Sequence, residues 1–212
     1  MPRDFDQYNP DDETVRALAR LLWSDRTAVV DSSAQVDEIP IEPDTIAGYH
    51  SLKIDESNWK GGASILYTFR LDTNRVESSL ETPAYLHPRT FKDVISVNIY
   101  VGPNQTTEDL LVASIKADMT SRMLGVPLCI PYYQLKHGPG DVCLVLFSCD
   151  SDPDSVLFSD QTVEMYRGNV RVTLRSSYKN FGCMDLAYRL DAYLIEQFEK
   201  AKQEREAKTE TP

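Results

Sequence analysis

The chain has 212 residues, of which 42% are hydrophobic, and its formal net charge is −11. This length and composition suit one folded domain with a hydrophobic core and exclude a wholly disordered chain. The negative charge disfavours general binding to nucleic acid or anionic lipid, and no apolar run approaches the roughly 20 residues of a membrane-spanning helix. The N-terminus has no apolar signal region, so we expect a cytoplasmic or nuclear protein.

The first predicted element is an amphipathic helix over residues 13–24. Its apolar side chains recur at helical spacing: Val15, Leu18, Ala19 and Leu22. Asp11 and Asp12 precede this stripe and suit the positive end of the helix dipole.

An extended arm is predicted to follow the helix. Pro40 and Pro43 exclude a central strand here. Up to Lys60 the chain has 13 acidic and six basic residues, so most of the net charge lies in this part. We interpret residues 1–60 as an acidic N-terminal helix and arm, which is either solvated or docked on a basic face of a neighbouring molecule.

Residues 61–198 predict a single core domain. Alternating apolar side chains indicate three strands with one buried face each: residues 65–71, 94–101 and 170–176. Residues 142–147 are apolar throughout and predict a strand buried on both faces. Pro131 interrupts residues 128–135, which places that strand near a sheet edge.

Two further amphipathic helices are predicted, at residues 107–124 and 183–200. Glu108 and Asp109 lie in the first turn of the earlier one, where acids are favourable. Residues 199–212 have no large apolar side chain and predict a flexible charged tail. The fold class is therefore α+β, a mostly antiparallel sheet or a jelly-roll sandwich with three amphipathic helices.

The sequence shows no recognisable catalytic or metal-binding constellation. It has neither a nucleophile elbow nor a phosphate-binding glycine loop. The three histidines fall in predicted loops or turns: His50, His87 and His137. The four cysteines lack zinc or redox spacing and predict reduced, buried thiols: Cys129, Cys143, Cys149 and Cys183. We expect no enzymatic activity, metal or cofactor, with a loop-borne site pairing Cys129 and His137 as the enzymatic alternative.

Arginine and tyrosine side chains gather around the strand at residues 170–176, a combination enriched at protein interfaces. The predicted contact residues are Tyr132, Tyr133, Tyr166, Arg167, Arg171, Arg175 and Tyr178. Ordinary half-buried sheet tyrosines would give the same pattern. If this face and the acidic arm meet, their unlike charges favour head-to-tail association.

Two fragments resemble the matrix proteins of rhabdoviruses: residues 89–94 (RTFKDV) and 165–174 (MYRGNVRVTL). A second set resembles the jelly-roll movement proteins of plant viruses: Gly61-Gly62, Asp72 near Arg75, Pro103-Asn104, and Gly125 with Pro127-Leu128. Both resemblances imply a viral, non-enzymatic protein in the host cytoplasm or nucleus or in the virion. Neither assigns a role to a residue.

We therefore expect a homo-oligomeric viral structural or assembly protein of matrix or coat type. Other viral proteins or nucleoprotein are further expected partners. The alternative is a movement or accessory protein that binds single-stranded nucleic acid through the basic strand. A small cytosolic enzyme is the third option.

Overall fold

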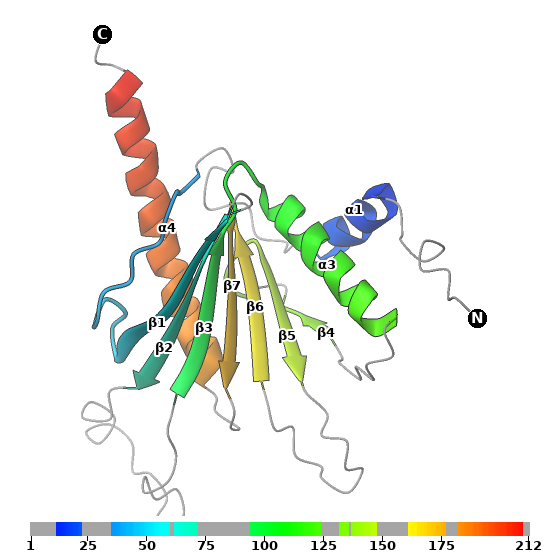
Figure 1. Ribbon diagram of the computed structural model, residues 1–212, viewed down its shortest axis with the longest axis horizontal. Coiled ribbons are helices and arrows are strands. Elements are labelled where there is room, and N and C mark those ends of the chain that lie inside the picture. Colours follow the sequence, from blue (N-terminus) through cyan, green and yellow to red (C-terminus); the bar gives the residue numbers. More distant parts are fainter. Residues whose placement is uncertain are drawn as a thin grey trace, which may run out of the picture.

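The computed structural model describes residues 12–22, 35–59, 62–71, 94–123, 132–135, 137–147, 161–176 and 182–209. In these residues a seven-stranded antiparallel sheet is flanked by three helices (Figure 1), which confirms the predicted α+β class. All the described strands belong to this one sheet, so they do not form the jelly-roll sandwich of the alternative.

The sheet has the strand order β1-β2-β3-β7-β6-β5-β4, and neighbouring strands are antiparallel. Its strands are β1 (Tyr49–Trp59), β2 (Gly62–Leu71), β3 (Val94–Val101), β4 (Tyr132–Gln134), β5 (Val142–Phe147), β6 (Gln161–Arg167) and β7 (Val170–Ser176). The described helices are α1 (Asp12–Leu21), α3 (Thr107–Met123) and α4 (Gly182–Thr209). β4 lies at one edge of the sheet, as predicted, and β1 lies at the other.

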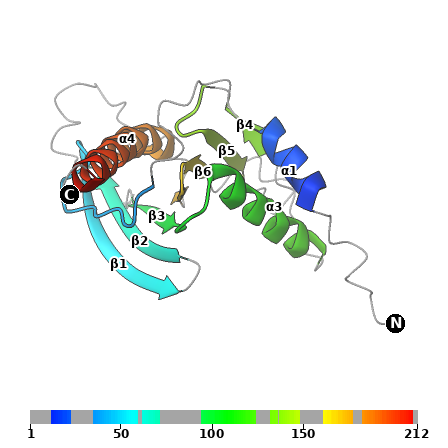
Figure 2. The ribbon, with the colours of Figure 1, turned by 90° about the horizontal axis from the view of Figure 1, so that it is seen from above.

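The helices lie on both faces of the sheet. Helix α4 covers one face, whereas α3, with α1 against it, covers the β6–β7 side of the other (Figures 1 and 2). Strand β5 contributes to both cores, because Cys143 and Val145 join the α4 core while Val142 and Leu144 join the α1–α3 core. The prediction of a strand buried on both faces is therefore confirmed. No helix in the described part of the chain is long and apolar enough to cross a membrane.

The N-terminal arm prediction is wrong for residues 35–59. Residues 35–48 are extended but pack on their own subunit, with four side chains in the α4 core: Val36, Ile39, Ile41 and Ile46. Residues 49–59 form β1, which pairs with β2 along its length. The prolines and the irregular apolar spacing concealed these contacts, because the core that receives them comes from distant parts of the chain.

The C-terminal boundary also differs from the prediction. Helix α4 continues to Thr209, and its last turns project beyond the sheet (Figure 1). Residues 199–209 are rich in Glu, Lys, Gln and Ala, which are strong helix formers. Lys200, Glu204 and Lys208 are spaced four apart, which supports a helix without an apolar stripe. A solvated helix therefore replaces the expected flexible tail up to that point.

Candidate functional site

Two of the predicted contact residues, Tyr166 and Arg167, lie inside the subunit. The Arg167 side chain is only 1% exposed. Its Nη2 donates to Asp191 Oδ2 at 2.9 Å, and its Nη1 donates to Asp141 Oδ1 at 3.1 Å. Tyr166 is fully buried and donates to Glu164. The prediction is wrong for both residues, because the carboxylates that hold Arg167 are more than 20 positions away in sequence.

The turn between β6 and β7 is a structural junction rather than a surface. Asp141 Oδ2 accepts hydrogen bonds from Thr107 Oγ1 at 2.8 Å and from the Gly168 amide at 3.0 Å. Asn169 Nδ2 donates to the carbonyls of Val36 and Gly102, and Asn169 Oδ1 accepts from the Val36 amide. This turn therefore connects the start of α3, the start of β5 and the segment at residues 35–48.

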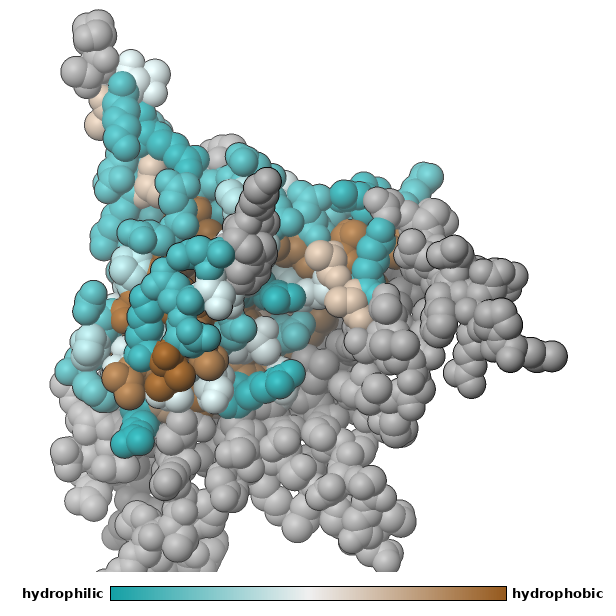
Figure 3. All heavy atoms as spheres, viewed as in Figure 1, coloured by the Kyte–Doolittle hydropathy of each residue, from teal (hydrophilic) through white to brown (hydrophobic). Residues whose placement is uncertain are grey.

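The side of β1, β2 and β3 that faces away from α4 forms the first candidate surface. We call the open sheet face the group Leu52, Leu66, Arg70, Asn98 and Arg175. These residues alternate with side chains that point into the α4 core, so they share one face. Arg70 and Arg175 are exposed, Leu52 is 57% exposed, and apolar residues gather over β1 and β2 in Figure 3.

Arg171 lies on this side of the sheet but turns toward α3. Its Nη1 donates to Ser114 Oγ at 2.8 Å, and its guanidinium carbon lies 5.5 Å from the centroid of the Tyr100 ring. Of the remaining predicted contact residues, Tyr178 lies outside the described residues. Tyr132 and Tyr133 lie in β4, but their side chains are outside the description. Arg175 is thus the predicted contact residue that is plainly exposed.

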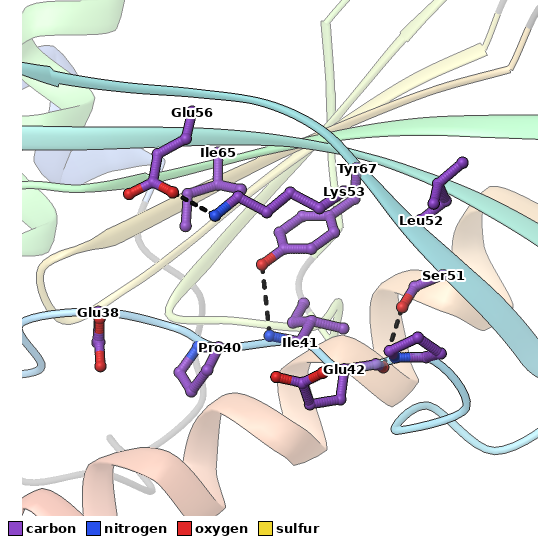
Figure 4. A pocket seen from close by; sticks show the side chains of 11 residues that line it. Glu38, Pro40, Ile41, Glu42, Ser51, Leu52, Lys53, Glu56, Ile65 and Tyr67 are labelled. Carbon is purple, nitrogen blue, oxygen red and sulfur yellow. Dashed lines mark hydrogen bonds and ion pairs between the residues drawn. The ribbon is translucent and has the colours of Figure 1, made fainter.

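The second candidate surface is a cleft between residues 38–43 and the strands β1 and β2 (Figure 4). Its volume is about 330 Å³. We call it the acidic cleft, and its lining is Glu38, Pro40, Ile41, Glu42, Pro43, Ser51, Lys53, Glu56, Ile65 and Tyr67. Leu52 also borders it, although its side chain lies with Thr68 on the other side of the hairpin. Buried Ile41, Ile65 and Tyr67 give it an apolar floor, while its three glutamates are exposed.

One cation of the same chain lies in the acidic cleft. Lys53 Nζ donates to Glu56, and its side chain extends along β1 toward that carboxylate (Figure 4). This hydrogen bond raises the pKa of Lys53 and lowers the pKa of Glu56, so both stay charged at neutral pH. Within the described residues, Glu38 and Glu42 form no ion pair. The cleft therefore keeps an excess of negative charge.

The two surfaces lie on opposite faces of the same β-hairpin. Lys53 and Tyr67 are paired across β1 and β2 on the α4 side, whereas Leu52 and Thr68 are paired on the other side. Because side chains alternate along a strand, the cleft floor and the open sheet face point in opposite directions. One subunit thus presents an arginine-bearing surface and an acidic surface back to back.

Of the side chains considered for catalysis, the structure describes only part. Cys129 and His87 lie outside the described residues, and His137 is exposed in a turn. Burial raises the pKa of the Cys143 thiol to about 12, and that of the Cys183 thiol to about 12. In the described ranges no group of His, Cys, Asp and Glu side chains could hold a metal ion.

Sequence reasoning missed the acidic cleft because its walls come from an irregular segment and an edge strand. The available signal was the alternation of Glu38 and Glu42 with Ile39 and Ile41, which suggests an extended segment with one buried side. No family model, curated protein or solved structure matches the chain. Its function is therefore inferred from these surfaces.

Proposed function

We propose that this protein is a non-enzymatic structural or assembly protein that associates with copies of itself. The observation that supports the proposal is the placement of an arginine-bearing surface and an acidic cleft on opposite faces of the β1–β2 hairpin. Two arginine-bearing surfaces repel each other, as do two acidic clefts, whereas an arginine-bearing surface attracts an acidic cleft. Contact between subunits is therefore head to tail.

Head-to-tail contacts lead to chains or rings rather than to closed dimers. Each exposed ion pair contributes only about 0.2–1 kcal/mol. Exposed apolar side chains on β1, Leu52 and Ile54, add area that a second subunit covers. Association of this kind is weak between two isolated copies and grows with protein concentration.

The proposed assembly is of virion matrix or coat type, in the host cytoplasm or nucleus or in the virion, with other viral proteins or nucleoprotein as further partners. The support for a viral role is the sequence resemblance at residues 89–94 and 165–174. The second fragment forms the turn and flanking strands of the β6–β7 hairpin, where Arg167 is buried. The charged surfaces support self-association independently of this resemblance.

Sedimentation velocity at several protein and salt concentrations tests the proposal. We expect the average sedimentation coefficient to rise with protein concentration at low salt and to fall as salt screens the exposed charges. A strict monomer at high protein concentration and low salt would remove self-association as the function.

A second candidate function is binding of single-stranded nucleic acid. It is favoured by Arg70 and Arg175, which are exposed on the open sheet face and have no carboxylate partner in the described residues. A gel-shift titration would then show salt-sensitive binding that R70Q and R175Q weaken. Glu38→Gln with Glu42→Gln would leave this binding intact but would reduce self-association, which separates the two functions.

A further inference from the structure

We infer that the acidic cleft receives the Arg175 side chain of a second copy, and that Lys53 of its own chain competes for the same place. This inference rests on the proposed self-association and names the contact that produces it. The apolar floor and charged rim suit a side chain with an apolar stem and a cationic tip. Lys53 already lies there in this way, with its stem along β1 and its ammonium group on Glu56.

The occupant is argued from charge complementarity on the same chain. The cations that the open sheet face presents are arginines, because Lys53 points to the cleft side of β1. An arginine has five donors in a planar fork and can contact more than one carboxylate, whereas a lysine is a single point charge. Glu38 and Glu42 have no ion pair in the described part of the chain, so both are available to such a fork.

Arg175 suits this role better than Arg167 or Arg171, the other arginines of the β6–β7 hairpin. Arg167 is enclosed by Asp141 and Asp191, and Arg171 is held by Ser114 and Tyr100. Arg175 is exposed, and across β3 its neighbours on the face are the small side chains Ser96 and Thr68. Among the described residues no carboxylate pairs with this guanidinium group, which points away from the α4 core.

Lys53 has a regulatory part in this arrangement. Its ammonium group neutralises Glu56 and lowers the negative charge that attracts an incoming arginine. Replacing Lys53 by methionine keeps an unbranched apolar stem and removes the charge. Glu56 then loses its ion pair and keeps its hydrogen bond from Asn58 Nδ2 at 3.2 Å. We expect the cleft to bind an arginine side chain about two- to fivefold more tightly.

The test uses the full chain and a capped synthetic peptide of residues 172–176, with arginine or the neutral isostere citrulline at position 175. Backbone amide shifts in an NMR titration report the site and the dissociation constant. We expect the arginine peptide to shift amides around the cleft and to bind more tightly than the citrulline peptide. Lys53→Met should strengthen this binding, and Glu38→Gln with Glu42→Gln should weaken it about tenfold.

Matched controls separate a local effect from a change in net charge. Glu204→Gln with Glu206→Gln removes two exposed carboxylates from the projecting end of α4 and should leave peptide binding unchanged. Equal binding of the arginine and citrulline peptides, or weaker binding after Lys53→Met, would overturn the inference. Peptide binding by a chain that never associates would support the cleft assignment and contradict self-association.

Self-association that survives Glu38→Gln with Glu42→Gln at full strength would have the opposite meaning. The proposed function would stand, but the cleft would not be its receptor. The peptide titration therefore tests the cleft assignment, the sedimentation run tests self-association, and either one can fail without the other.

Discussion

Arg167 and Asp191 form a buried, two-point ion pair between β6 and α4. Arg167 Nε and Nη2 each donate to one oxygen of the Asp191 carboxylate, and both side chains are at most 5% exposed. The pair fixes α4 against the sheet. Residues 35–48 contribute side chains to the core that α4 and the sheet share, so the pair also helps to hold this segment in the place that shapes the acidic cleft.

Removing Asp191 is therefore expected to destabilise the whole subunit. D191A would leave the Arg167 charge buried with Asp141 alone, and the loss of one partner of a buried pair costs about 3–5 kcal/mol. The free energy of unfolding from a urea titration measures this loss. E199A removes an exposed carboxylate from the same helix and should stay within about 0.5 kcal/mol of the wild type.

Gly168 in the β6–β7 turn should not tolerate a side chain. Its φ is +53°, and a Cβ at this position would lie 2.7 Å from the ring of Phe198. We expect Gly168→Ala to lower the free energy of unfolding by about 2–4 kcal/mol, of which about 1 comes from strain and about 1–3 from overpacking. Gly48 has a φ of +80° but nothing within 4 Å, so Gly48→Ala should cost less, about 1 kcal/mol. Equal costs would contradict this account of the turn.

The thiols of Cys143 and Cys183 should be inert in the folded protein. Burial raises the pKa of each from an ordinary value of 9.0 to about 12, so the reactive thiolate is scarce at pH 8. Residue-resolved mass spectrometry after iodoacetamide treatment should find both unmodified in the native state and modified in urea. Rapid native labelling of either cysteine would contradict their burial.

The same pKa shifts predict how stability depends on pH. Between pH 9 and 12 the unfolded chain loses these protons while the folded chain keeps them, so the unfolded state is favoured as pH rises. Chemical denaturation of Cys143→Ser with Cys183→Ala should show a weaker decline over this range than the wild type. An identical decline would assign the effect to other groups.

Local patterns were sufficient for the elements that follow a simple period. The apolar run of β5 predicted a strand buried on both faces, and the alternation in β7 predicted a strand with one buried face. Helix α3 was predicted within one residue of its observed ends. In each case the side chains that decide the structure are neighbours in sequence.

The remainder depended on contacts between distant residues. Strand β1 was missed because an edge strand keeps exposed apolar and charged side chains, such as Leu52 and Asp55, and contains a bulge after Lys53. Arg167 looked like a surface residue because Asp141 and Asp191 come from two other elements. The acidic cleft exists only after residues 38–43 pack beside β1, so no local pattern outlines it.

The most direct measurement of head-to-tail association is sedimentation velocity on two neutralised variants, alone and mixed. R70Q with R175Q leaves the cleft intact, and E38Q with E42Q leaves the open sheet face intact. We predict that each variant alone is largely monomeric at concentrations where the wild type associates. An equimolar mixture should form a one-to-one complex that does not grow further.

Lys202→Gln with Lys208→Gln, which removes two exposed cations from α4, should associate like the wild type. Full association of either neutralised variant by itself, or a mixture that stays monomeric, would contradict the account.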